Sequence, residues 1–399
     1  MNSISQPYVK RLLTAHSFFV AGKVFFGLFM SVFIWSETKD INLVATFYIT
    51  YLLIHTFSFT VFASLVKKGV MHFPRKLGII GCASVYFSIF LLGDRAIEHL
   101  IPIAMGFGFF NGMYWISYHI FRFDYTKTSN RGNYTGTEKA IGTVIGIILP
   151  ILGGYIIVQN FYNYGYGNVF LLGSFLYLVS FFIGNIPLPK STHTKLHLRK
   201  TIKEIMKHKD LQKSMIVYFL GGFGRAGALL RILLPLLIFD ILQNEFELGG
   251  WLSFFALISA FLAGLFGRHI NYKHYKNFAT IGGLLFFVSI LSLIGFPILL
   301  TYIIFGIVKE LGSLFLQIPK RVISENLVHQ IDDYTHHRVE YIVIREWFGI
   351  LFGRGSSYVL LLFVGSLAVQ QLQYVLVIMA FAVIVEILFL RSINQESYK

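Results

Sequence analysis

The stretch LGGFGRAGALLRILLPLLIF, Leu220–Phe239, lies near the middle of the 399-residue chain and is apolar apart from two arginines. An apolar run of about 20 residues is long enough to cross the hydrocarbon core of a bilayer as a helix. Arg225 and Arg231 would then lie within the membrane, where a guanidinium costs at least ~2.5–3.5 kcal/mol on insertion scales. The stretch therefore predicts a membrane-spanning helix, and its arginines predict a partner or a ligand inside the membrane.

The composition indicates the same class of protein for the whole chain. The chain is 55% hydrophobic and only 13% charged, whereas soluble domains carry roughly 25% charged residues. Its net charge of +15 would be compatible with nucleic acid in a soluble protein, but basic residues are expected in the cytoplasmic loops of a membrane protein. We therefore expect the lipid bilayer as a partner and no nucleic acid.

Apolar windows of about 19 residues occur twelve times along the chain, and each is long enough to span the membrane. They cover residues 12–35, 41–66, 76–93, 98–121, 139–158, 167–188, 214–239, 249–267, 278–296, 298–319, 341–366 and 371–391. The sequence thus predicts an all-α integral membrane protein with twelve transmembrane helices.

The distribution of basic residues orients these segments. Of the 34 Lys and Arg residues, 26 fall on the side of the N-terminus and two on the opposite side, with residues such as Arg75 and Lys320 assigned to loops. Because basic loops stay in the cytoplasm, both termini are expected there. The remaining six basic residues lie inside the apolar segments: Lys23, Arg225, Arg231, Lys309, Arg345 and Arg354.

The longest loop, Pro189–Lys213, divides the chain into an N-terminal bundle (1–189), a basic linker (190–213) and a C-terminal bundle (214–399). In the linker, apolar residues recur at the spacing of one face of a helix, and basic residues lie between them. This pattern predicts a short amphipathic helix, lying either on the membrane surface or as a soluble linker helix.

The two halves match one another when they are shifted by about 200 residues. Gly22-Lys23 falls on Gly224-Arg225, Glu138 falls on Glu340 and Gly153 falls on Gly355, all at an offset of 202. A parallel six-helix repeat is one of the plans on which membrane transporters are built.

The fifth segment, GTVIGIILPILGGYII (Gly142–Ile157), and the basic loops after segments two and eight resemble those of the major facilitator superfamily. The run GFFNGMYWISYHIFRFDYTKTSNRGNYTG is similar to the fourth-helix region of a poorly characterised bacterial subgroup of that family. Two features depart from the family pattern: Leu149 replaces a glycine of the fifth-helix motif, and the loop KKGVMHFPRKLG lacks the usual acidic residue.

The resemblance implies a secondary transporter of the bacterial cytoplasmic membrane. It would move a small molecule by alternating access between two six-helix bundles and would act as a monomer. No Walker loop, dinucleotide fingerprint or nucleophile elbow occurs in the sequence, so we expect neither an enzyme nor a nucleotide-driven pump, and no cofactor. The single cysteine, Cys82, excludes a CxxC metal site, and His336-His337, assigned to a loop, lack further metal ligands.

Small residues in the fifth segment form a stripe that allows another helix to approach closely. Such a stripe would serve a rocking interface between bundles or static packing, and the sequence supports both interpretations. The residues are Gly142, Gly146, Pro150, Gly153 and Gly154.

Charged residues near the predicted midplane provide the candidate substrate site. Lys23, Arg225 and Lys309 lie about 11–12 residues into their segments, and Glu310 is the only acid at that depth. One hypothesis is an anionic substrate held between Lys23 and Arg225. The alternative is a structural pair between Arg225 and Glu310, with Lys23 and Lys309 facing an aqueous cavity.

Other charged groups have secondary roles in this interpretation. Glu310 is also the candidate carrier of a coupling proton or cation, and Arg354 is a further candidate for the substrate site. Glu138 and Glu340 are predicted to open helices five and eleven, where carboxylates complement the helix dipole, and with Arg122 to hold the cytoplasmic gate.

Two further functions are compatible with the sequence. Abundant Phe, Tyr and Trp residues favour efflux of lipophilic or drug-like compounds. A membrane receptor or assembly factor that does not transport is an alternative outside this class.

Overall fold

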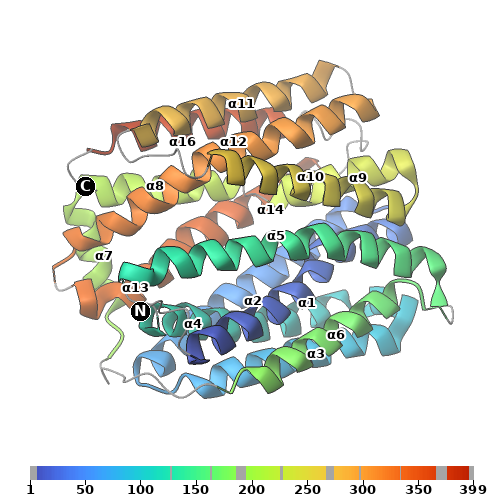
Figure 1. The fold of residues 1–399 in the computed structure, drawn as a ribbon, viewed down its shortest axis with the longest axis horizontal. Coiled ribbons are helices and arrows are strands. Elements are labelled where there is room, and N and C mark those ends of the chain that lie inside the picture. The colour runs from blue at the N-terminus through green and yellow to red at the C-terminus, as the bar shows by residue number, and fades with distance from the viewer. Residues whose placement is uncertain are drawn as a thin grey trace. The chain divides into compact units, whose positions relative to one another are not determined.

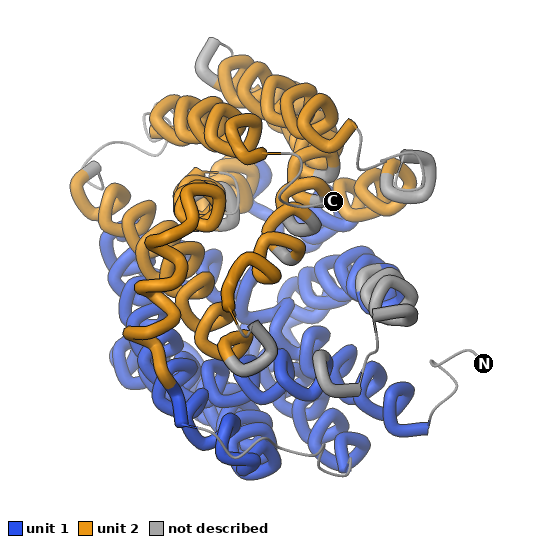
Figure 2. The backbone as a smooth tube through the Cα atoms, turned by 90° about the vertical axis from the view of Figure 1, so that its left-hand side faces the viewer, with its two compact units in different colours: residues 1–196, 242–253 blue, residues 197–241, 254–399 orange. Residues whose placement is uncertain are grey.

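The computed structural model describes residues 7–125, 128–161, 164–185, 195–224, 228–266, 274–295, 298–332, 334–364 and 375–394. Helices make up almost all of these residues, and no β-strand occurs among them (Figure 1). The chain divides into two compact units, coloured separately in Figure 2. Unit 1 comprises residues 1–196 and 242–253, and unit 2 comprises residues 197–241 and 254–399.

Unit 1 contains six long helices, one 3-10 helix and the first part of α10. These elements are α1 (Pro7–Thr38), α2 (Ile41–Lys67), α3 (His72–Leu92), the 3-10 helix η2 (Gly93–His99), α4 (Leu100–Tyr125), α5 (Thr128–Gln159), α6 (Tyr166–Ile183) and α10 (Glu245–Phe266).

Unit 2 contains the remainder of α10 and the helices that follow the linker. These are α7 (Leu198–Lys207), α8 (Lys209–Phe223), α9 (Ala228–Leu242), α11 (Tyr275–Gly295), α12 (Leu299–Leu327), the 3-10 helix η5 (Val328–Gln330), α13 (Tyr334–Glu346), the π-helical segment η6 (Trp347–Arg354), α14 (Gly355–Val364) and α16 (Val375–Ser392).

Nine helical stretches of the described residues are long and apolar enough to cross a membrane. One of them, His72–Arg122, is 51 residues long and covers two of the segments predicted from the sequence. The structure is therefore that of a multi-pass, all-helical membrane protein.

The core of unit 1 is built around α1. Phenylalanine residues along this helix are almost completely buried against α2, α4, α5 and α6. The ring of Phe26 stacks on that of Phe107 of α4 with centroids 3.9 Å apart. Close approach of α4 to α2 depends on Gly108 and Gly112, because a Cβ at either position would meet the backbone of α2.

The linker contains the predicted helix, α7, which packs on α13 within unit 2. Thr201 and Ile205 are buried, and the Thr201 hydroxyl lies 2.9 Å from Nδ1 of His337. Met206 is 62% exposed on the opposite face. The prediction that His336-His337 occupy a loop is wrong, since α13 begins at Tyr334 and includes both.

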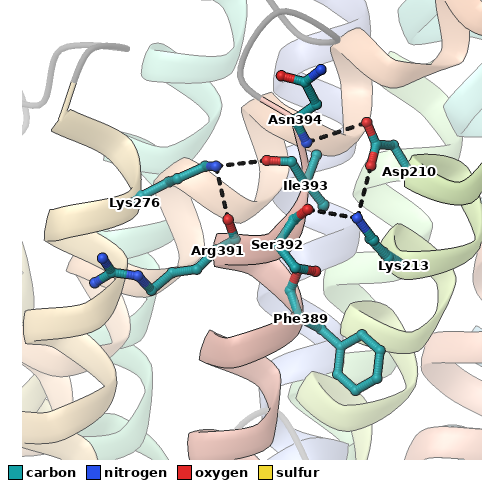
Figure 3. A network of polar contacts seen from close by, with 8 residues as sticks. All are labelled: Asp210, Lys213, Lys276, Phe389, Arg391, Ser392, Ile393 and Asn394. Atoms are coloured by element: carbon teal, nitrogen blue, oxygen red, sulfur yellow. Dashed lines mark hydrogen bonds and ion pairs between the residues drawn. The ribbon is translucent and has the colours of Figure 1, made fainter.

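Polar groups tie the end of α16 to α8 and α11 (Figure 3). Lys276 donates to the carbonyl oxygens of Arg391 and Ile393, at 2.8 and 2.6 Å. Lys213 donates to the Ser392 carbonyl, and Asp210 accepts from the backbone N–H of Asn394. These contacts satisfy carbonyls at a helix C-terminus, where positive charge also complements the helix dipole.

Within the predicted segment 214–239 the structure describes α8, which ends at Phe223, and α9, which begins at Ala228. Two further predictions about the course of the chain are corrected. Lys320 and Arg75 are not loop residues: α12 continues to Leu327 and α3 begins at His72, so both side chains lie on helices and are buried.

Candidate functional site

Lys23 lies near the middle of α1 and is half-buried. Its Nζ atom lies 4.7 Å from the centroid of the Trp115 ring on α4. A cation over the face of an indole is stabilised by the ring quadrupole, and this stabilisation increases where water is excluded. Unit 1 thus holds a positive charge and an aromatic surface together inside its helices.

One backbone hydrogen bond of α1 is interrupted by a side chain beside Lys23. The N–H of Phe26 donates to the hydroxyl of Tyr86 at 3.0 Å, and that hydroxyl donates to the carbonyl of Gly22 at 3.0 Å. Tyr86 of α3 therefore stands between the two groups that an uninterrupted helix would join directly. The insertion gives the helix a local irregularity one turn long at the position of the lysine.

Trp115 also offers a hydrogen-bond donor at this place. Its Nε1 atom is buried and has no hydrogen-bond partner among the residues that the structure describes. Asn111 lies one turn earlier on the same face of α4, and its Oδ1 accepts from the hydroxyl of Tyr51 at 3.1 Å. A buried indole N–H normally has a partner, so the site has a donor to offer to a ligand or to water.

Lys309 and Glu310 of α12 pair with each other, with Nζ and Oε1 2.8 Å apart. Both side chains are about one-fifth exposed, at 21% and 20%. The acid that the sequence places near the midplane is therefore engaged by its chain neighbour. Arg225, its predicted alternative partner, lies outside the described residues, as does the side chain of Arg231.

Arg354 ends the π-helical segment η6, which packs closely on α8 within unit 2. A Cβ at Gly222 of α8 would collide with Gly349, and one at Gly353 would meet the carbonyl of Phe219 at 2.6 Å. A single π turn within an α-helix occurs frequently at functional sites. Arg354 is half-buried beside this crossing.

The glycine stripe of α5 divides into two parts. Gly154 leaves no room for a Cβ against the backbone of Glu245, and Gly249 of α10 lies equally close to the carbonyl of Pro150. Gly153 packs on the ring of Phe29 of α1. Among the described residues, none lies within 4 Å of a Cβ built at Gly142. The close backbone contact is thus confined to one end of the stripe.

Glu138 and Glu340 do not open helices, which corrects the prediction of a capping role. The helix α5 begins at Thr128 and α13 begins at Tyr334, so both carboxylates lie well inside them. Arg122 and Glu138 do meet, with Nε and Oε2 3.6 Å apart. Glu340 is fully buried and accepts from the backbone N–H of His197 at 2.9 Å.

Sequence reasoning missed two charged groups that the fold creates. His16 of α1 lies 3.3 Å from Glu138, and Lys320 of α12 lies 3.0 Å from Glu386 of α16. The only signal in the sequence was a histidine near the start of an apolar segment.

Comparison with known proteins identifies the family. A sequence model of the Major Facilitator Superfamily matches residues 99–318, which is more than half of the chain. The chain therefore belongs to the major facilitator superfamily, and it is a membrane transporter and not an enzyme, as the sequence predicts.

The proteins that resemble this chain do not identify its substrate. The uncharacterized protein YqgE of Bacillus subtilis (strain 168) is 24% identical over 340 residues, covering 84% of this chain and 78% of that protein. The human organic anion transporter MFSD10 (TETRAN) superposes with a TM-score of 0.68 at 13% identity, covering 96% and 99% of the two chains.

A bacterial homologue of the iron transporter ferroportin, in an inward-facing state, gives a TM-score of 0.64 at 11% identity, covering 96% and 98% of the chains. At these identities the likeness to the solved structures concerns the fold alone.

Proposed function

We propose that the protein is a secondary transporter of a small anionic solute, with Lys23 and Arg225 as the cations that recognise it. Lys23, Arg225, Lys309 and Glu310 carry a formal charge of +2 together. Lys309 and Glu310 pair with each other, which supports a role for Lys23 and Arg225 in recognising the substrate. Ammonium and guanidinium groups suit the carboxylate or phosphate of an anionic solute.

The observation that carries the proposal is the arrangement of Lys23 and Trp115. The ammonium group, the indole face and the buried Nε1 donor lie at one place beside the opened turn of α1. Lys23 and the indole N–H suit a carboxylate or phosphate, and the ring suits an apolar body. We therefore expect an amphipathic anion rather than an inorganic one.

The aromatic residues favour efflux of lipophilic compounds less than their number suggests. On α1 they are used in packing, because Phe19, Phe25, Phe26, Phe29 and Phe33 are each at most 2% exposed. Rings buried in this way belong to the interior of unit 1 and offer no surface to a substrate.

The remaining features of the proposed transporter follow from the sequence. Twelve helices would form bundles 1–189 and 214–399, joined by the linker 190–213, with both termini in the cytoplasm and a monomer in the bacterial plasma membrane. The bundles would alternate the access to the site, with the stripe of α5 at a moving contact and Glu138, Arg122 and Glu340 closing the cytoplasmic end. The transporter neighbours in the comparisons support this plan.

The proposal is tested by binding and flux with defined anions. Purified protein is screened by thermal shift against aromatic and aliphatic carboxylates, phosphate monoesters and hydrophobic cations, and the strongest ligands are used for flux in proteoliposomes. Lys23→Gln should weaken binding of the anion about 10- to 100-fold, because a charge-assisted contact contributes about 1.5–3 kcal/mol.

Lys39→Gln is the matched control. Lys39 follows the last residue of the same helix, is exposed, and lies over a different indole, that of Trp35, at 5.6 Å. Its replacement should leave anion binding unchanged. Stabilisation by hydrophobic cations and by no anion would overturn the proposal in favour of efflux.

A further inference from the structure

The ring of His16 is held by two polar partners from two different helices. Its Nδ1 atom lies 2.8 Å from the hydroxyl of Tyr114 on α4, and its Nε2 atom lies 3.3 Å from Oε1 of Glu138 on α5. The ring stacks on Tyr118 with centroids 3.5 Å apart and planes within 5°. His16 is 3% exposed, so its orientation is fixed by packing as well as by these contacts.

The ring keeps a contact with both partners whether or not it carries a second proton. In the neutral ring, Nε2–H donates to Glu138 and Nδ1 accepts from the Tyr114 hydroxyl. In the protonated ring, Nδ1–H donates to the same hydroxyl oxygen, and the contact with Glu138 becomes an ion pair. The ring therefore keeps both contacts on protonation, while the Tyr114 hydroxyl changes from donor to acceptor.

One carboxylate serves two cationic partners in this cluster. Glu138 contacts His16 through Oε1 and Arg122 through Oε2, the latter at 3.6 Å. Protonation of His16 strengthens the link between α1 and α5 in competition with the link between α4 and α5. The Glu138 side chain is 21% exposed, which gives protons a path to a histidine that is otherwise enclosed.

The other titratable groups facing His16 are few and come from known helices. Lys23 of α1 acts on it from the same helix, and Arg75 of α3 acts through Tyr114. The uncharged titratable neighbours are Tyr118 of α4, Tyr134 of α5, which hydrogen-bonds Tyr118 at 3.1 Å, and Tyr177 of α6, which packs on Phe19. Among the described groups that face His16, Glu138 is the one that carries a negative charge.

We propose that His16 and Glu138, together with Arg122, form a proton-binding site through which transport is coupled to the proton gradient. The inference rests on the proposed function as a transporter and assigns its coupling ion. The proton is shared by the pair and belongs to neither residue alone. It also moves the coupling site from Glu310, which pairs with Lys309, to unit 1.

Trp115 provides a direct readout, because its ring lies edge-on to His16 with centroids 5.5 Å apart. The other tryptophans, Trp35, Trp251 and Trp347, are replaced by Phe, and the emission of Trp115 is followed with pH in lipid nanodiscs without substrate. Protonated imidazole quenches indole emission, so we expect a reversible loss of emission as the pH is lowered.

Three variants assign the titration. His16→Gln should abolish it, and Glu138→Gln should move its midpoint to lower pH because the negative charge that favours the proton is removed. His119 is the matched control, since its ring also lies 5.6 Å from that of Trp115. His119→Gln should keep the titration of the parent protein.

The outcomes separate this inference from the proposed function. A folded single-tryptophan parent with no titration, or one whose titration is lost with His119 and kept without His16, overturns the proton site. This holds even if His16→Gln does not fold, because the parent and the His119 variant suffice. A second arm measures intravesicular pH in proteoliposomes given the anion that binds best.

Anion flux without proton movement overturns the coupling, whereas an intact Trp115 titration without any anion flux overturns only the proposed substrate. Proton uptake that accompanies anion flux and disappears in His16→Gln supports both.

Discussion

The clusters around Glu138 in unit 1 and Glu386 in unit 2 are both ionic contacts between helices, but they are built differently. The side chains of Lys320 and Glu386 are 10% and 0% exposed. Lys320 also donates to the carbonyl of Val217 at 3.0 Å and lies 4.9 Å from the ring of Tyr218. Glu138 instead is one-fifth exposed and is shared between His16 and Arg122.

The difference separates a contact that holds a fold from one that can change state. Breaking a buried pair is costly, because removing either charge leaves the other uncompensated. A carboxylate shared by two cationic partners can instead shift toward one of them when the charge of the other changes. We therefore interpret the Lys320–Glu386 pair as structural and the His16–Glu138–Arg122 cluster as functional.

The largest effect is expected from breaking the pair in unit 2. Glu386→Gln should cost about 3–5 kcal/mol, and lower the Tm by on the order of 5–10 °C, because Lys320 is left as a buried charge. Thermal unfolding followed by size-exclusion chromatography measures this. The double variant Lys320→Met/Glu386→Leu should recover most of the loss, and a single variant as stable as the parent would contradict the structural role.

A smaller and different effect is expected from Arg122→Gln in unit 1. Glu138 keeps His16 as a partner, so the Tm should change by a few degrees at most. Removing the competing positive charge should move the midpoint of the Trp115 emission titration to higher pH. A large loss of stability with an unmoved midpoint would place this cluster in the same class as the pair in unit 2.

The smallest effect is expected at the pair of α7, where the ammonium group of Lys207, whose side chain is 61% exposed, lies 2.6 Å from Oε1 of the largely buried Glu204. The hydrogen bond from Lys207 lowers the pKa of Glu204, and the same bond raises the pKa of Lys207. Because a depressed carboxyl pKa favours the folded state only while the group is ionised, the contribution is present at neutral pH and is lost in acid.

Lys207→Gln should change the Tm by about 1 °C or less at neutral pH, and high salt should remove the difference. A change as large as that of Glu386→Gln would show that exposure does not rank these contacts.

The repeat in the sequence explains why the two units were expected to be more alike. Glu138 and Glu340 correspond at the offset of 202, and the same offset places Tyr218 where α1 has His16. Glu340 accepts a backbone N–H from His197 of the linker segment, a contact that replaces the histidine side chain of unit 1. The repeat thus preserves the position of a carboxylate while its partners differ.

Sequence alone determined the class of this protein. Apolar windows of span length placed nearly every long helix, since a bilayer requires about 20 apolar residues with their backbone hydrogen bonds satisfied within the segment. The motifs of the fifth and fourth segments indicated the superfamily, and Lys23, Lys309 and Glu310 lie on helices that are long and apolar enough to cross a membrane. These properties depend on short stretches of the chain, so they can be predicted from the sequence alone.

Only the tertiary structure decided which charges meet. His16 and Glu138 are far apart in the sequence, as are Lys320 and Glu386, and their contacts depend on which faces of the helices pack together. The insertion of the Tyr86 hydroxyl between Gly22 and Phe26 likewise has no local signature. Apolar periodicity predicts that a helix exists, but its neighbours are set by side-chain packing across the whole unit, and those neighbours determine what each buried charge can do.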